Sequence, residues 1–157
     1  MISWPDFQAQ QPELARQGAG LLYHYGVGLA FLGTVRADGG PRLHPMCPLL
    51  TGTGLYAFIV PSPKRDDLHR DGRYAMHSFP ADETEDAFML SGTARSTEDG
   101  AVRDRLEARY REERDLSGST LMEDQELFEF VIERCLMTRT KGHGDRSPHH
   151  VVWRAPP

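Results

Sequence analysis

The residues best suited to chemistry follow an apolar run in "LYAFIVPSPKRDDLHRDGR". Ser62 offers a hydroxyl group, and Lys64 and Arg65 offer positive charge. Pro63 is typical of the first residue of a helix, so the segment predicts a strand followed by a first helical turn. Such turns bind phosphate through unpaired N–H groups and the positive end of the helix dipole. Ser, Pro and Lys are also common in turns, so a phosphate site and an ordinary capped surface helix both remain open.

A second cluster of potential ligands lies near the C-terminus in "KGHGDRSPHH". His143, Asp145, His149 and His150 are residue types that bind zinc and other transition metals. Neighbouring histidines on a strand point to opposite faces, and the two glycines and the proline provide no rigid frame. We therefore favour a mobile polar loop and expect no metal site.

No nucleophile stands out in the sequence. Ser91 lacks the G-x-S-x-G pattern of an activated serine, and Cys47 has only His44 nearby as an activator. Cys47 and Cys135 lie far apart without a C-x-x-C pairing, which favours free thiols in a reducing cytosol.

Composition limits the class of protein. The 157 residues suit a single domain over residues 1–157, with 39% hydrophobic and 26% charged residues. A net charge of −5 argues against a general nucleic-acid binder. The N-terminal "MISWPDFQAQ" does not resemble a signal peptide, and no apolar run approaches the roughly 20 residues of a membrane span. We expect a cytoplasmic protein without membrane association.

Hydrophobic periodicity predicts mostly strands. The expected strands are a hairpin over 29–50 turning at Asp38–Gly40, then 55–60, 73–79, 87–96, 127–140 and 149–154. The expected helices run from Pro12 to about Tyr25, from Pro63 to about His69, and onward from an N-cap at Thr97. Gly92 indicates a bulge or a close backbone approach. Strands joined by tight turns pair antiparallel, and closure removes exposed edges, so we expect an antiparallel β-barrel of six or seven strands with peripheral helices.

The order of these segments resembles the flavin-binding split-barrel family typified by pyridoxamine 5'-phosphate oxidase. The similar segments are "LAFLGTVRADGGPRLHPMCPLL", "GLYAFIVPSPKRDDLHRDGRYAMHSF" and "FMLSGTARSTEDGAVRDRLEARY". Family members share a hairpin with a D-G turn, a strand ending in Ser-x-Lys, a helix ending in basic–Asp–x–Arg, a strand, and a strand with Gly followed by a small residue. The resemblance covers roughly Leu29 to Tyr110, about half the chain, and its specificity comes from order and spacing.

The resemblance implies a mainly β (α+β) split β-barrel and a set of cofactor contacts. Ser62 and Lys64 would bind the phosphate of flavin mononucleotide (FMN), or of a deazaflavin as in a sister group, with Arg65 as a helper. Other residues would lie along the isoalloxazine ring or ribityl chain, often through backbone groups: His44, Pro45, Met46, Cys47, Ile59 and Val60. Trp153 would cover a cofactor edge, although anchoring the last strand by burial is the commoner role of such a residue.

Two regions depart from the oxidase pattern. The second-strand motif keeps Arg42 but has no later Lys or Arg, and the C-terminal Arg-x-His pair is replaced by Arg146, His149 and His150 at other spacings. Cofactor binding is therefore a stronger expectation than pyridoxamine phosphate oxidation. A haem-degrading branch of the family uses a C-terminal histidine region, so haem remains a further alternative.

The expected function is an FMN-dependent oxidoreductase acting on a small molecule, with the flavin ring supplying the redox chemistry. The resemblance implies a homodimer with cofactor sites at the subunit interface. The alternatives are a deazaflavin-dependent reductase of the same fold and a non-catalytic flavin-binding or sensing barrel. No catalytic acid or base is identified, because a lone strand histidine such as His44 is more often a packing residue.

Overall fold

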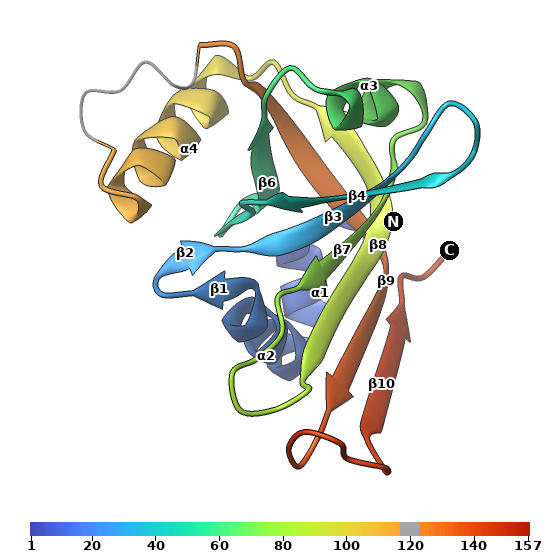
Figure 1. The fold of residues 1–157 in the computed structure, drawn as a ribbon. Helices are drawn as coiled ribbons and strands as arrows, with labels where there is room; N and C mark the ends of the chain where they lie inside the picture. Colours follow the sequence, from blue (N-terminus) through green and yellow to red (C-terminus); the bar gives the residue numbers. More distant parts are fainter. Residues whose placement is uncertain (117–122) are drawn as a thin grey trace.

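The computed structural model describes residues 1–116 and 123–157 and shows an antiparallel sheet curled into a split barrel with helices around it (Figure 1). The described helices are α1 (Trp4–Gln10), α2 (Pro12–Leu22), α3 (Pro63–Arg70) and α4 (Gly100–Glu113). The described strands are β1 (Tyr23–His24), β2 (Val27–Gly28), β3 (Ala30–Val35), β4 (Pro41–Met46), β5 (Leu49–Thr51), β6 (Gly54–Ile59), β7 (Arg73–Ser78), β8 (Ala87–Ser96), β9 (Glu126–Arg139) and β10 (His149–Arg154). No helix among these residues is long and apolar enough to cross a membrane.

A two-residue link between β4 and β5 joins the two ends of the sheet. The strand order of the main sheet is β4-β3-β7-β8-β9-β6-β5, and β10 pairs with β9 beside this path. The two strands at the ends of the order, β4 and β5, are separated in the sequence only by Cys47 and Pro48. The chain therefore links both ends of the sheet directly, and the sheet must curl.

Strand β9 holds the barrel together. One edge of β9 pairs with β8 along most of its length. The opposite edge pairs first with β6, over 126–129, and then with β10, over 134–139. Between these two partners, Ile2 forms an isolated bridge with Ile132. The barrel is split at this edge, because β6 and β10 lie at opposite ends of β9 and do not pair with each other (Figure 1).

The inner faces of the strands and the N-terminal helices form the main core. Its fully buried side chains include Phe7, Leu22, Leu32, Met76, Phe88, Leu90, Phe130 and Ile132. A second cluster lies under α4, where Leu106 packs with Leu49, Tyr56, Phe58 and Leu127. Helices α1 and α2 thus close one part of the barrel and α4 another.

Gly92 marks a bulge, as its sequence position predicts. The β8–β9 register shifts between Ser91 and Gly92. A Cβ atom at Gly92 would lie 2.0 Å from the carbonyl oxygen of Val131, so only glycine fits this approach of the two backbones.

The structure confirms the predicted antiparallel split barrel, including the hairpin around Asp38–Gly40 and helix α3. The main sheet has eight strands because the short β5 adds to those expected. The predicted N-cap at Thr97 is wrong. Its N–H donates to the carbonyl of Leu127, and the side chain of Asp99 caps α4 instead. Helix α2 ends at Leu22, earlier than predicted, because Tyr23–His24 turns into a small hairpin.

Candidate functional site

Helix α3 starts where β6 ends and leaves donors free at its N-terminus. Ser62 has an extended backbone and occupies the N-cap, and Pro63 begins the helix. The Ser62 hydroxyl donates to the carbonyl of Val60 and does not cap the helix. Arg65 and Asp66 donate their N–H groups to the Ser62 carbonyl. The N–H of Lys64 has no acceptor in the described part of the chain, so it remains available to a ligand.

The two cations of this segment differ in their partners. Arg65 Nη1 donates to the carbonyl of Asp124 at 3.1 Å, and its Nε lies 3.9 Å from a carboxylate oxygen of Glu126. Arg65 therefore ties α3 to the start of β9. The half-buried Lys64 forms no hydrogen bond or ion pair within residues 1–116 and 123–157. Its ammonium is the free positive charge at the start of α3.

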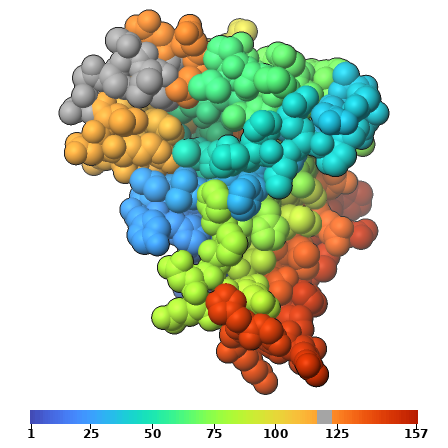
Figure 2. Space-filling model, in the orientation of Figure 1, coloured from blue at the N-terminus to red at the C-terminus, as the bar shows by residue number. Residues whose placement is uncertain are grey.

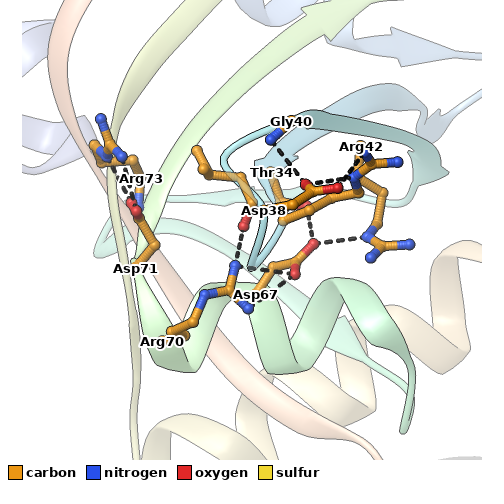
Figure 3. Close-up of polar contacts among 10 residues, drawn as sticks. Thr34, Asp38, Gly40, Arg42, Asp67, Arg70, Asp71 and Arg73 are labelled. Carbon is orange, nitrogen blue, oxygen red and sulfur yellow. Dashed lines mark hydrogen bonds and ion pairs between the residues drawn. The ribbon is translucent and has the colours of Figure 1, made fainter.

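A buried carboxylate lies one turn further along α3. The Asp67 side chain is 3% exposed and accepts hydrogen bonds from Thr34 Oγ1 at 2.8 Å, Arg42 Nε at 2.7 Å and Arg70 Nη2 at 3.1 Å (Figure 3). Arg70 also donates to the carbonyl of Val35. Burial alone would raise the pKa of the Asp67 carboxyl, but the hydrogen bonds from Arg42, Thr34 and Arg70 outweigh it, and the pKa lies below its usual value. Asp67 is therefore an ionised hub that joins α3 to the β3–β4 hairpin.

The bond to Asp67 holds Arg42 on the same face of α3 as Lys64. Only Nε of Arg42 is occupied by Asp67, and its terminal nitrogens have no partner in the described chain. Lys64 precedes Asp67 by three residues, which places both on one face of α3. The β3–β4 hairpin (cyan) and α3 (green) also adjoin at the molecular surface in Figure 2. Two cations with free donors thus flank one buried carboxylate, an arrangement suited to an anion.

The sequence analysis did not single out Asp67, yet a signal was available. The predicted turn at Asp38–Gly40 sets a hairpin register in which Thr34 lies opposite Arg42, as the structure has it. A polar pair on an otherwise buried face requires a polar partner from the element that covers it. Asp67 is that partner.

The residues that were predicted to lie along a cofactor are found on both sides of an open seam between β4 and β6. The β5–β6 ladder ends at Leu49 opposite Tyr56, and extending its register would place Pro45 opposite Val60. Strand β4 instead pairs only with β3, so no described strand covers the facing edges of β4 and β6. The side chains of these predicted residues have the following environments: Met46 and Ile59 are buried, His44 and Cys47 are half-buried, and Pro45 and Val60 are exposed.

Trp153 lies apart from this seam within one chain. It packs against Phe7 at a ring-centroid distance of 4.9 Å, next to the main core. Trp153 pairs with Cys135 of β9, whereas Ile59 pairs with Glu126 of the same strand. Nine residues of strand span about 30 Å. One chain therefore does not bring Trp153 to Ser62 and Lys64.

The C-terminal histidine segment does not converge on one point. His143 Nδ1 lies 3.9 Å from Glu85, and His150 Nδ1 lies 3.0 Å from Thr138 Oγ1. The Asp145 carboxylate accepts N–H donors from its own loop, at Lys141 and Ser147. Over residues 1–116 and 123–157, no group of three or more His, Cys, Asp or Glu side chains is placed to hold a metal ion.

Both cysteines are free thiols in the structure. Burial raises the pKa of the Cys135 thiol to about 12, so it stays protonated at neutral pH. Cys47 is half-buried in the two-residue link between β4 and β5.

Comparison with known proteins shows a shared fold without close sequence similarity. No family profile and no curated protein matches the sequence. The fold is similar to that of a heme binding protein from Mycobacterium smegmatis, with a TM-score of 0.68 and 14% identity over 92% of this chain. This chain spans 59% of the length of the mycobacterial protein.

Two further structures share the fold. A protein related to general stress protein 26 of B. subtilis, of the pyridoxinephosphate oxidase family and from Clostridium acetobutylicum, has a TM-score of 0.60 and 15% identity over 96% of this chain and 95% of its own. The heme storage protein HutZ from Vibrio cholerae has a TM-score of 0.57 and 16% identity, covering 78% of this chain and 89% of its own. The chain therefore has the split-barrel fold found in pyridoxine-phosphate-oxidase-family and haem-binding proteins.

Proposed function

We propose that the protein is an FMN-binding oxidoreductase that acts on a small molecule as a homodimer. The observation that carries the proposal is the pair of cations with free donors beside the N-terminus of α3. Lys64 has no partner in the described chain, and Asp67 holds Arg42 by its Nε alone.

These groups suit the phosphate end of the cofactor. A phosphate needs several donors from different directions, and charge-assisted bonds are the strongest available. The Lys64 ammonium and N–H, the terminal nitrogens of Arg42 and the positive end of α3 provide them. Ser62 stands at the N-cap of the same turn, and its hydroxyl would exchange the Val60 carbonyl for a phosphate oxygen. Arg65 would act through its link to β9, by fixing the helix.

The open seam suits the ring end of the cofactor. Unpaired edges of β4 and β6 offer backbone N–H and C=O groups in line, next to the apolar Met46 and Ile59. When bound, the flavin supplies hydride transfer, and this chain binds and orients the ring.

The outer face of the sheet is suited to contact with a second copy of the chain. One row of residues crosses the sheet in register from β4 to β10: Pro45, Phe31, His77, Met89, Leu136 and Val152. Next to this row, Leu43 is 66% exposed, and Val152 within it is 50% exposed. Such a mostly apolar face is typical of an obligate interface. In a dimer, a partner's β10 would supply the cofactor contact that Trp153 does not make within one chain.

Haem is the second candidate, because two similar structures bear the names of a heme binding and a heme storage protein. His149 and His150 begin β10 with exposed side chains, and either imidazole could serve as an iron ligand.

The visible spectrum of the protein separates these candidates. Two broad flavin bands, in the protein as purified or after reconstitution with FMN, would support the proposal. A single deazaflavin band would indicate a deazaflavin in place of FMN, and a strong Soret band would indicate haem. A protein that stays colourless with all three would contradict cofactor binding.

Substituting Lys64→Ala tests the phosphate assignment. Loss of a charge-assisted contact costs about 1.5–3 kcal/mol, so FMN should bind roughly ten- to a hundredfold more weakly. Lys141→Ala is the matched control, because Lys141 is the other lysine of the chain and is exposed in the C-terminal loop. Equal FMN affinity in both variants would show that Lys64 does not bind the phosphate.

A further inference from the structure

Two arginines lie directly opposite each other on the outer face of the sheet, away from the seam. Arg134 of β9 pairs with Ser91 of β8 on one side and with Arg154 of β10 on the other. The bulge beside Ser91 leaves Glu133 as the extra residue of β9. The three strands that carry these residues run side by side in Figure 1. Side chains of one row on a sheet lie within reach of one another, so both guanidinium groups share one site.

No carboxylate bonds to this arginine pair in the described chain. Nε of Arg134 is buried and has no hydrogen-bond partner. In the described chain neither Arg134 nor Arg154 makes a side-chain hydrogen bond or an ion pair, and Glu133 bonds to neither of them. Like charges directly opposite each other destabilise a sheet, and a buried donor without an acceptor adds to that cost. An anion between the two guanidinium groups would remove both penalties.

A pocket is present at this position. Its volume is about 330 Å³, and it is lined by Ser91, Glu133, Arg134, Arg154 and Ala155. Two guanidinium groups and one carboxylate give the lining a net charge of +1. The volume lies at the lower end of the range of roughly 300–1,000 Å³ found for small-molecule sites.

We propose that this arginine pocket binds the carboxylate or phosphate group of a small molecule. A guanidinium presents a planar fork of donors that matches the paired oxygens of either group, and two forks from neighbouring strands hold one anion from two sides. The Ser91 hydroxyl adds a donor from β8. Binding places the unpaired Arg134 Nε against an oxygen and screens Arg134 from Arg154.

The arginine pocket is distinct from the proposed FMN phosphate site. Lys64 follows β6, which pairs with β9 only over 126–129. Arg134 lies at least five residues further along β9, or about 17 Å. Within one chain, an anion at one site therefore does not contact the other, and the arginine pocket does not require that FMN binds at α3.

Calorimetric titration of the flavin-free protein with inorganic phosphate, and separately with acetate, tests this site. We expect saturable binding of at least one anion, weakened about tenfold or more by Arg154→Gln. Arg95→Gln, a change of an exposed arginine elsewhere on β8, should leave it unchanged. Lys64→Ala should leave the Arg154-dependent binding unchanged, which separates this binding from any phosphate bound at α3. Tighter binding of phosphate would show that the arginine pocket prefers a phosphate group, and tighter binding of acetate would show that it prefers a carboxylate. No saturable binding, or equal binding by Arg154→Gln and wild type, would overturn the proposal.

Thermal unfolding provides a second measurement, in which the sign of the effect is diagnostic. Without multivalent anions at low salt, Arg154→Gln should raise Tm, because it removes the repulsion from Arg134. With saturating phosphate or acetate, whichever binds, the wild type should gain stability by mass action and the variant should not, so the order of their Tm values reverses. Arg154 is exposed, and its substitution leaves the core intact. A variant that lowers Tm equally in both buffers would show that Arg154 has only a structural role.

Discussion

Substituting Asp67→Asn tests the buried hub between α3 and the β3–β4 hairpin. Asparagine keeps the size of the side chain but removes the charge, and its amide group would face the donors of Arg42 and Arg70. Breaking a buried ion pair by removing one partner costs about 3–5 kcal/mol. The side chains of Arg42 and Arg70 are 28% and 40% exposed and can regain water, which favours the lower end of that range. We expect a loss of about 3 kcal/mol in the free energy of unfolding at pH 7.

Urea unfolding measures this loss. With a slope of about 2 kcal/mol per molar urea, the midpoint should fall by roughly 1.5 M at unchanged slope. Asp66→Asn is the matched control, because Asp66 precedes Asp67 on the same helix, is exposed, and has no side-chain partner in the described chain. Its effect should stay within about 0.5 kcal/mol. A loss below about 1 kcal/mol for Asp67→Asn, or one equal to that of Asp66→Asn, would refute the hub.

The pH dependence checks the electrostatic origin of the effect. The folded pKa of Asp67 lies below the unfolded value of about 3.9, so its stabilising contribution is complete above that pH. The contribution is lost as the pH falls through the folded pKa. The stability gap between wild type and Asp67→Asn should therefore narrow below about pH 4. A gap that widens on acidification would contradict a carboxylate stabilised by its arginine partners.

Two further predictions concern the backbone of β8 and the cap of α4. Gly92→Ala should cost about 3 kcal/mol or more, because its Cβ would lie 2.0 Å from the Val131 carbonyl oxygen. Gly100→Ala, where nothing lies within 4 Å, should leave Tm unchanged or slightly raised. Asp99→Ala should cost about 1 kcal/mol in urea unfolding, because it removes the cap of α4. Thr97→Ala should destabilise the protein by less than half of that amount. A larger loss for Thr97→Ala than for Asp99→Ala would show that Thr97 is the cap.

Local signals in the sequence predict much of this fold. Asp38–Gly40 supplies a turn with its own register, Pro63 begins a helix, and the alternating residues of 127–140 define a strand that is buried on one face. Gly92 predicts the bulge for the same local reason, since a strand interior tolerates glycine where two backbones approach. These features depend on residues close together in the chain.

The features that the sequence analysis missed depend on tertiary contacts. Thr97 has a good capping side chain, but pairing with Leu127 keeps it in the extended conformation, and the helix begins later. From its local sequence Asp67 resembles a solvated helix residue. Its hydrogen bonds come from Thr34 and Arg42 of a hairpin more than twenty residues away. Trp153 was predicted both at a cofactor and in a buried role. Its packing on Phe7 depends on an N-terminal helix that periodicity did not reveal.

The dual pairing of β9 has a consequence for how the chain folds during synthesis. Strands β6 and β8 each need an edge of β9, which begins only at Glu126. Until that strand leaves the ribosome, β3, β4 and β7 can pair with their neighbours, but β6 and β8 each keep an unpaired edge. The barrel therefore closes late, and between the synthesis of β8 and that of β9 the nascent chain carries two unpaired strand edges. Chaperone binding to ribosome-bound chains should depend on whether β9 has emerged, and should decline once it has.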